Sequence, residues 1–210
     1  MFEYAENKQI IIKVKDMLKM VKIFFDVETT GLSSECAITQ LSGVVEVDGE
    51  VAEEFNLLMA PHAGAEINPE ALEVQGGTKE EIMSYPNPGA QFRKFRRLLE
   101  KYVDKFNPKD KIFLVGYNNR QFDDQVLRAW FNRNQDKFFG SYFWSNSLDV
   151  LVLAGEYLQR RRLRMPNFKL ATVAKELGLV FSDEQFHDAM FDVRVTRAIY
   201  EIVTGRAMEL

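Results

Sequence analysis

Two strand patterns joined by Asp48-Gly49 constrain the fold of this chain most strongly. An Asp-Gly pair between two such runs is a strong signal for a two-residue β-hairpin turn. The arms of the hairpin are expected at residues 39–48 and 51–58. A short apolar run at residues 22–27 (KIFFDV) is expected to form a buried strand just before them. Together the three strands predict an antiparallel meander.

Helical and strand patterns alternate in the rest of the chain. Helices are expected at residues 69–74, 79–83, 91–106, 122–131, 148–162, 169–177 and 189–204, and strands at 112–117 and 142–144. In the helix at 91–106, bulky apolar side chains recur at positions 92, 95, 99, 102 and 106. Pro108 is expected to end that helix, and Ser147 to cap the helix at 148–162. This order indicates an α/β fold with helices packed on a mixed sheet.

The composition is that of an ordinary globular protein. The chain has 210 residues, of which 46% are hydrophobic and 28% charged, enough for one domain with a sizeable core. No apolar run approaches the ~20 residues of a membrane span, and no secretory signal is visible. The single Cys36 excludes an internal disulfide and suits a reducing, cytoplasmic location. We expect an N-terminal extension at residues 1–20 and one domain at 21–210.

Two acidic residues stand at the end of the first predicted strand. Asp26 and Glu28 are two positions apart, so their side chains share one face of the strand. Two carboxylates on one face of a hydrophobic run repel each other unless cations lie between them. An Asp-x-Glu pair alone is also common at solvated strand ends, so both interpretations stay open here.

Two later positions continue this acidic pattern. Asp123 is expected at the start of the helix at 122–131, where the helix dipole alone would favour an acid. His187 and Asp192 would lie about 140° apart on a helix. They can face one site only if His187 lies on the incoming loop, with Asp188 as the helix N-cap. Such carboxylates can hold two divalent cations on a phosphodiester, and the histidine can accept a proton from the attacking water.

In combination, three segments resemble the motifs of the DEDDh (DnaQ-like) 3′–5′ exonuclease family: residues 26–32 (DVETTGL), 117–123 (YNNRQFD) and 187–192 (HDAMFD). That family includes the proofreading subunit of bacterial DNA polymerase III, exonuclease X, RNase T and oligoribonuclease. The resemblance extends from about residue 22 to about residue 203. It implies an RNase H-like fold, in which a mixed five-stranded sheet of three antiparallel and two parallel strands is flanked by helices.

The resemblance also implies roles for individual residues. Four carboxylates would hold two divalent ions, Mg2+ or Mn2+: Asp26, Glu28, Asp123 and Asp192. His187 would take the proton of the attacking water, and Leu32 would wedge between bases. Substrate contacts are implied for Thr29, Thr30, Leu32, Glu70, Gln75 and Asn118. Many family members have histidine at the position of Gln75, which puts the contact there in doubt.

The expected function is therefore a 3′–5′ exonuclease that acts on single-stranded 3′ ends, with DNA favoured, and releases nucleoside 5′-monophosphates. Two alternatives stay open: an RNA-directed exoribonuclease, and a catalytically idle adaptor that binds nucleic acid or a polymerase. The net charge of −4 argues weakly against a general polyanion binder. The arginines at 160–162 and 164 could guide a nucleic-acid backbone, or could merely end a solvated helix. A DNA polymerase partner and a role in proofreading or repair stay open.

Overall fold

Five strands form one sheet in the order β3-β2-β1-β4-β5. The computed structural model describes residues 19–33, 35–74, 76–181 and 188–205. The strands are β1 (Val21–Thr29), β2 (Ile38–Val47), β3 (Glu50–Leu58), β4 (Ile112–Gly116) and β5 (Leu148–Asp149). β1, β2 and β3 pair antiparallel, while β4 pairs parallel with both β1 and β5. The mixed five-stranded sheet implied by the sequence is therefore confirmed.

The β2–β3 hairpin closes through the Asp-Gly turn. Asp48 has a φ of 53° and Gly49 a φ of 98°, so both lie in the left-handed region. A type I′ turn requires this conformation at both central residues, which explains the preference for Asp-Gly. The hairpin places β3 at the edge of the sheet, and the acidic residues of β3 discourage pairing with another chain there.

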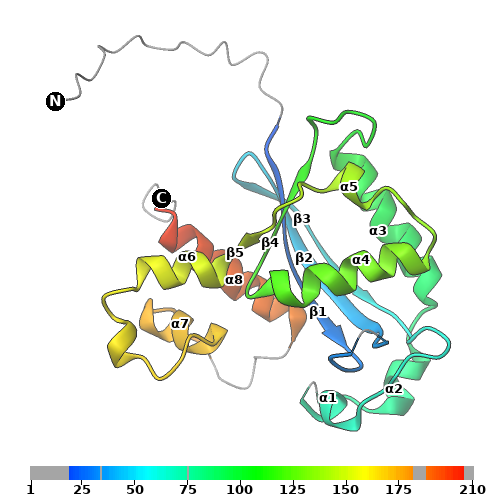
Figure 1. Cartoon of the computed structure of the whole chain (residues 1–210), viewed down its shortest axis with the longest axis horizontal. Coiled ribbons are helices and arrows are strands. Elements are labelled where there is room, and N and C mark those ends of the chain that lie inside the picture. Colours follow the sequence, from blue (N-terminus) through cyan, green and yellow to red (C-terminus); the bar gives the residue numbers. More distant parts are fainter. Residues whose placement is uncertain (1–18, 34, 75, 182–187, 206–210) are drawn as a thin grey trace.

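Helices cover both faces of the sheet, as Figure 1 shows. One face carries α3 (Pro88–Tyr102), α4 (Asp123–Arg133) and α5 (Phe139–Tyr142), and the other carries α6 (Val150–Tyr157), α7 (Leu170–Glu176) and α8 (Ala189–Val203). The short helices α1 (Pro69–Val74) and α2 (Lys79–Ser84) follow the meander. Two 3-10 turns, η2 (Asn119–Gln121) and η3 (Arg162–Arg164), complete the described elements. None of these helices is long and apolar enough to cross a membrane.

The central strand β1 supplies both hydrophobic cores. Ile23, Phe25 and Val27 are buried in the core beneath α3 and α4. Phe24 points the other way, into the core formed with α6, α7 and α8, where its ring packs edge-on against Tyr200 at 5.3 Å between centroids. Because side chains alternate along a strand, the residues of β1 at even-numbered positions, like Phe24, also face α8.

The helix expected at 91–106 begins earlier and ends earlier than its apolar pattern suggests. It starts at Pro88, where the Asn87 side chain caps it by accepting from the Ala90 N–H at 3.1 Å. After Tyr102 the Asp104 carboxylate accepts a hydrogen bond from the Phe106 N–H at 3.0 Å. Such side-chain bonds to the backbone compete with helix formation. Phe106 is therefore outside the helix and 76% exposed, and Pro108 is not the residue that ends it.

The strand expected at 142–144 is wrong. Residues Phe139–Tyr142 form the helical turn α5, and Phe143 makes only an isolated bridge with Ile112. The fifth strand is Leu148–Asp149 instead, followed directly by α6.

The N-cap and the C-terminal end of α6 also differ from the prediction. The cap is Asp149, whose carboxylate accepts from the Leu151 N–H at 3.0 Å, and not Ser147. The helix stops at Tyr157, so residues 160–164 lie in a turn and in η3. The interpretation of this arginine cluster as a helix C-terminus is therefore wrong.

Candidate active site

An acidic cluster forms where β1 extends beyond β4. The parallel ladder between the two strands ends at Phe24 and Val115, whereas β1 continues to Thr29. The last residues of β1 therefore have no described ladder partner on that side. The carboxylate of Asp123 accepts a hydrogen bond from the Val27 backbone N–H. This bond places Asp123 beside the strand segment that carries Asp26 and Glu28.

A tight turn after β4 brings Asp123 to this position. Gly116 ends the strand, and a Cβ atom there would lie only 2.6 Å from the Cβ of Asn119 and 3.3 Å from the Phe25 carbonyl oxygen. Asn118 follows in the left-handed conformation, with a φ of 58°, and its N–H donates to the Asp149 carboxylate at 2.9 Å. The chain can then turn through η2 into α4, which starts at Asp123.

Helix α8 brings the fourth carboxylate from the other face of the sheet. Asp188 caps the helix, as the sequence predicted, because its side chain accepts from the Phe191 N–H at 2.9 Å. Asp192 lies one turn further along the helix, and α8 packs on β1 and β2. Asp26 and Glu28 face α8, so their carboxylates and that of Asp192 converge.

Burial and mutual repulsion raise the pKa values of these carboxyls. For Asp26 the largest cause is burial, followed by the charges of Asp123 and Glu28, and its pKa lies well above the ordinary value. Burial, then Asp192 and Asp123, raise the pKa of Glu28 to about 8. Burial also raises the pKa of Asp123 to about 7, although its own N–H and that of Val27 oppose the shift.

The donor chemistry of the cluster fits hard divalent cations. Carboxylate oxygens are the ligands that Mg2+ prefers, and a cation would relieve the repulsion among them. Within the described residues, no three acidic, histidine or cysteine side chains already enclose a point where an ion could sit. The carboxylates are near enough to act on one another's pKa, and ion binding would have to draw their oxygens together.

The residues predicted to bind substrate differ in how exposed they are. Thr29 and Thr30 are buried. The Thr30 hydroxyl accepts a hydrogen bond from the Ala37 N–H and donates one to the Glu66 carbonyl oxygen. Leu32, in the loop after β1, is 85% exposed. Asn118 is exposed on the turn described above.

Of the remaining predicted site residues, only Glu70 is among the described residues. Glu70 lies in the first turn of α1, exposed, and its N–H donates to the Asn68 side chain at 2.9 Å. His187 and Gln75 lie outside the described residues. Their roles, like those of the whole predicted set, stay predictions.

Two further acids belong to the cluster and were not predicted from the sequence as site residues. The charges of Asp124 and Asp149 both act to raise the pKa of Asp123. Asp149 pairs with Gly116 across β4 and β5, at the edge of the sheet where the parallel strands end. An aspartate at the carboxyl end of a parallel strand can indicate a site residue. Asp149 was missed because a strand of only two residues has no recognisable sequence pattern.

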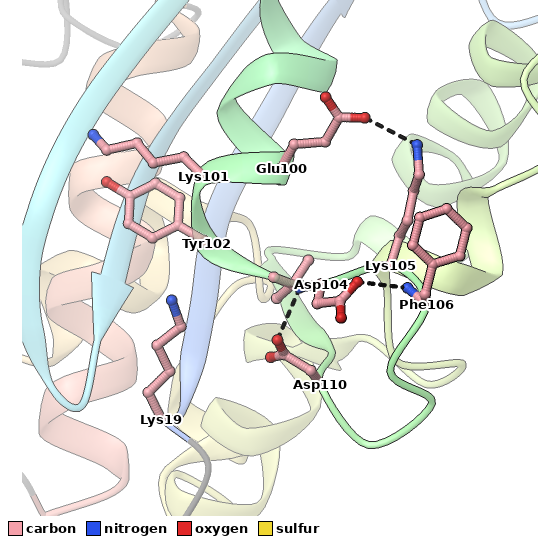
Figure 2. A pocket seen from close by; sticks show the side chains of 9 residues that line it. Lys19, Glu100, Lys101, Tyr102, Asp104, Lys105, Phe106 and Asp110 are labelled. Atoms are coloured by element: carbon pink, nitrogen blue, oxygen red, sulfur yellow. Dashed lines mark hydrogen bonds and ion pairs between the residues drawn. The ribbon is translucent and has the colours of Figure 1, made fainter.

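The hollows on the described surface include two near the acidic cluster and a third further away. One of about 80 Å3 is lined by Glu28 and by Gly76 and Gly77, which follow α1. A second, of about 350 Å3, lies between Leu32 and helix α4. The third, of about 500 Å3, lies near the amino end of β1 and is shown in Figure 2. Its lysines alternate with acids, and the Lys105 ammonium donates to Glu100 at 3.0 Å, so no single charge dominates it.

Comparison with known proteins identifies the family. A family model described as Exonuclease matches residues 23–200. The chain belongs to this exonuclease family. The DnaQ-like resemblance carried by the three motifs is thereby confirmed, together with the prediction of an exonuclease domain.

The relatives found are forms of exonuclease I. Exodeoxyribonuclease I of Escherichia coli (strain K12) is 36% identical over 114 residues, which is 48% of this chain and 23% of that protein. Exodeoxyribonuclease I of Buchnera aphidicola is 28% identical over 153 residues, which is 60% of this chain and 35% of that protein.

Solved structures of E. coli exonuclease I have the same fold. A complex with a dT13 oligonucleotide has a TM-score of 0.69 and 25% identity, over 89% of this chain and 41% of the other. The zinc-bound form with single-stranded DNA has a TM-score of 0.71 and 26% identity, over 90% and 41%. This chain thus spans less than half the length of these relatives.

Proposed function

We propose that this chain is a metal-dependent 3′–5′ exonuclease that hydrolyses the terminal phosphodiester of single-stranded DNA and releases nucleoside 5′-monophosphates. The observation that carries the proposal is the convergence of Asp26, Glu28, Asp123 and Asp192 from three separate elements. Membership of the exonuclease family supports the reaction class. Relatives solved with single-stranded DNA support the choice of substrate.

Each element would contribute a distinct part of the chemistry. Two Mg2+ or Mn2+ ions would supply the positive charge that stabilises an in-line displacement at phosphorus. Asp26 and Glu28 would hold them from β1, Asp123 from α4 and Asp192 from α8. His187 would accept the proton of the attacking water, a role that rests on the motif resemblance. Leu32, exposed in the loop after β1, would separate the terminal base from the next one, a role that also rests on the motif resemblance.

The charged groups found to act on Asp26 and Glu28 are other acids, and this favours a catalyst over an idle adaptor. Every contribution found for the pKa values of Asp26 and Glu28 raises them. A protein that only needed the fold would be more stable with uncharged residues at these positions. A DNA polymerase partner, which the sequence left open, gains no support from the relatives found.

The direct test is degradation of matched 5′-labelled DNA and RNA oligonucleotides by the purified chain, with Mn2+ and with chelator. We expect stepwise shortening of the DNA from its 3′ end and no cleavage in chelator. Asp26→Asn should abolish nucleotide release while thermal unfolding stays cooperative. Arg194→Gln is a suitable control, since Arg194 is exposed on α8 and pairs with Glu54 on β3.

Two outcomes would reject the proposal. Full activity of Asp26→Asn would remove the acidic cluster from the mechanism. Tight binding of single-stranded DNA without any release of nucleotide in Mn2+ would support the adaptor instead. Preferential shortening of the RNA would keep the chemistry and correct the substrate.

A further inference from the structure

The loop between β4 and α4 lies beside the short strand β5. This loop, residues 117–122, joins Gly116 at the end of β4 to Asp123, the first residue of α4. On β5, Asp149 is the register partner of Gly116. The end of β5 is therefore next to the start of the loop, where its side chains can bond to the loop backbone.

Helix α4 begins without a side-chain cap of its own. Its N-cap residue is Phe122, whose side chain has no hydrogen-bonding group. By contrast, α3, α6 and α8 begin at the capping residues Asn87, Asp149 and Asp188. A cap of this kind normally satisfies the first N–H groups of a helix and fixes its first turn. Contacts from elsewhere in the fold must therefore fix the position of Asp123.

A single oxygen of Asp149 binds two backbone groups on different elements. Its Oδ1 atom accepts a hydrogen bond from the Leu151 N–H at 3.0 Å and so caps α6. The same atom accepts one from the Asn118 N–H at 2.9 Å, in the loop before α4. Asn118 has a φ of 58°, a left-handed conformation that few residues other than glycine adopt. The carboxylate thus stabilises the point at which the chain turns from β4 toward α4.

A second contact from the same segment holds the first turn of α4. The buried Ser147 hydroxyl donates a hydrogen bond to the Asp124 carboxylate. The other oxygen of that carboxylate accepts from the Asn119 side-chain amide at 3.0 Å, within η2. Asp124 directly follows Asp123 in the chain, so the bond to Ser147 acts next to the predicted metal ligand. Asp149 and Ser147 together hold the chain on both sides of Asp123.

The position of Asp123 decides whether its carboxylate can share an ion with β1. The Val27 N–H donates to this carboxylate, whereas Asp26 and Glu28 project from the same strand as Val27. Mg2+ accepts oxygen ligands only within a narrow range of distance, about 2.0–2.1 Å. A small shift at the start of α4 would therefore weaken ion binding. Groups that orient metal ligands from outside typically change metal affinity by about 10–100-fold when they are removed.

We propose that Asp149, together with Ser147, is a positioning residue that sets the divalent-ion affinity of the acidic cluster by fixing the loop before α4. This inference rests on the proposed function, because it concerns the same site. Asp149 binds neither the ion nor the substrate in this account. It acts through the Asn118 N–H and the helix start that follows, and Ser147 acts through Asp124.

The first test compares Asp149→Ala with Asp149→Asn. Both variants lack the negative charge, but the asparagine oxygen can still accept both hydrogen bonds, so the difference between them isolates positioning. Mn2+ binding to the protein without substrate is measured from the electron paramagnetic resonance signal of unbound Mn2+. We expect the Mn2+ dissociation constant of Asp149→Ala to exceed that of Asp149→Asn by at least about tenfold. At saturating Mn2+, kcat for a thymidine oligonucleotide should also be lower in Asp149→Ala.

The second test uses Ser147→Ala and does not depend on Asp149→Ala folding. Loss of the bond to Asp124 should raise the Mn2+ dissociation constant about fivefold, the net contribution of one hydrogen bond. Asn87→Ala is the matched control, because it removes the cap of α3, which carries none of the four predicted metal ligands. It should lower Tm, as the loss of a helix cap does, and leave Mn2+ binding unchanged.

The outcomes separate this inference from the proposed function. If the wild type binds Mn2+ but releases no nucleotide from DNA or RNA, the proposed function fails, and the binding measurements still decide the inference. If Asp149→Ala and Asp149→Asn bind Mn2+ equally well, or equally poorly, the hydrogen bonds do not set the affinity and the inference is overturned. A loss in Asn87→Ala as large as that in Ser147→Ala would also overturn it, since lower stability would then explain both. A wild type that binds no Mn2+ would reject both proposals.

Discussion

Glu28→Gln should make the protein more stable in the absence of metal, even though it removes a predicted metal ligand. Glutamine has nearly the same shape as glutamate and carries no charge. Burial and the neighbouring acids raise the pKa of Glu28 from 4.5 to about 8. At about 1.4 kcal/mol per pH unit, this sets a ceiling of about 5 kcal/mol on the cost of ionising Glu28 in the folded protein. Because the acids can rotate apart and share the proton, we expect a gain of about 2 kcal/mol.

The gain in stability of Glu28→Gln must increase as the pH rises. A carboxyl with a raised pKa binds its proton more tightly in the folded state, so stability falls as pH rises from 4.5 to about 8. The variant should therefore match the wild type below about pH 4 and exceed it most at about pH 9. In thermal unfolding with chelator, about 2 kcal/mol corresponds to a rise in Tm of about 4–8 °C for a chain of this size.

Glu46→Gln is the control, because Glu46 is a buried carboxylate with partners. It lies 2.7 Å from the Lys22 ammonium and 3.4 Å from the Arg197 guanidinium, on the same face of the sheet. Its neutralisation should destabilise the protein by roughly 3–5 kcal/mol, because the buried Lys22 ammonium loses its counter-charge. A Glu28→Gln variant that is less stable than the wild type at about pH 9 in chelator would refute the electrostatic account of the cluster.

Two further predictions follow from the same geometry. Burial raises the pKa of Glu28 to about 8 and that of Asp123 to about 7, so protons should compete with cations there, and activity at limiting Mn2+ should rise between about pH 6 and pH 9. The midpoint should move to lower pH as Mn2+ is raised, and a midpoint independent of Mn2+ would contradict the assignment. Gly116→Ala should cost about 2 kcal/mol in denaturant unfolding, since the new Cβ meets Asn119 at 2.6 Å. Gly140→Ala, with nothing within 4 Å of its new Cβ, should cost far less, and equal losses would disprove the steric argument.

The parts of the site that depend on local periodicity could be predicted from the sequence. Asp26 and Glu28 share a face because a strand repeats every two residues, whatever surrounds it. Asp188 caps α8 because an aspartate before an apolar helical pattern does so locally. The β2–β3 hairpin could be predicted for the same reason, because the Asp-Gly turn depends only on the backbone conformation of its own two residues.

Features that depend on tertiary contacts could not be predicted in this way. The stretch around Tyr142 has the aromatic composition of a strand, yet its rings pack on Phe131 and the chain coils into α5. The two residues of β5 are a strand only because β4 lies beside them. The convergence of Asp123 with β1 required the unequal lengths of β1 and β4, which no local pattern contains.

The α8-facing row of β1 shows why the acidic cluster indicates function and not merely folding. Lys22 at one end of the row is buried and neutralised by Glu46, which is how a stable fold treats a charge that it must bury. Asp26 and Glu28 at the other end face further acids, and burial and repulsion raise their pKa values. The first turns of α4 and α8 begin at the cluster, and their dipoles offset only part of that repulsion. The same strand therefore pairs its buried charge where only stability matters and leaves like charges together where cations are expected to bind.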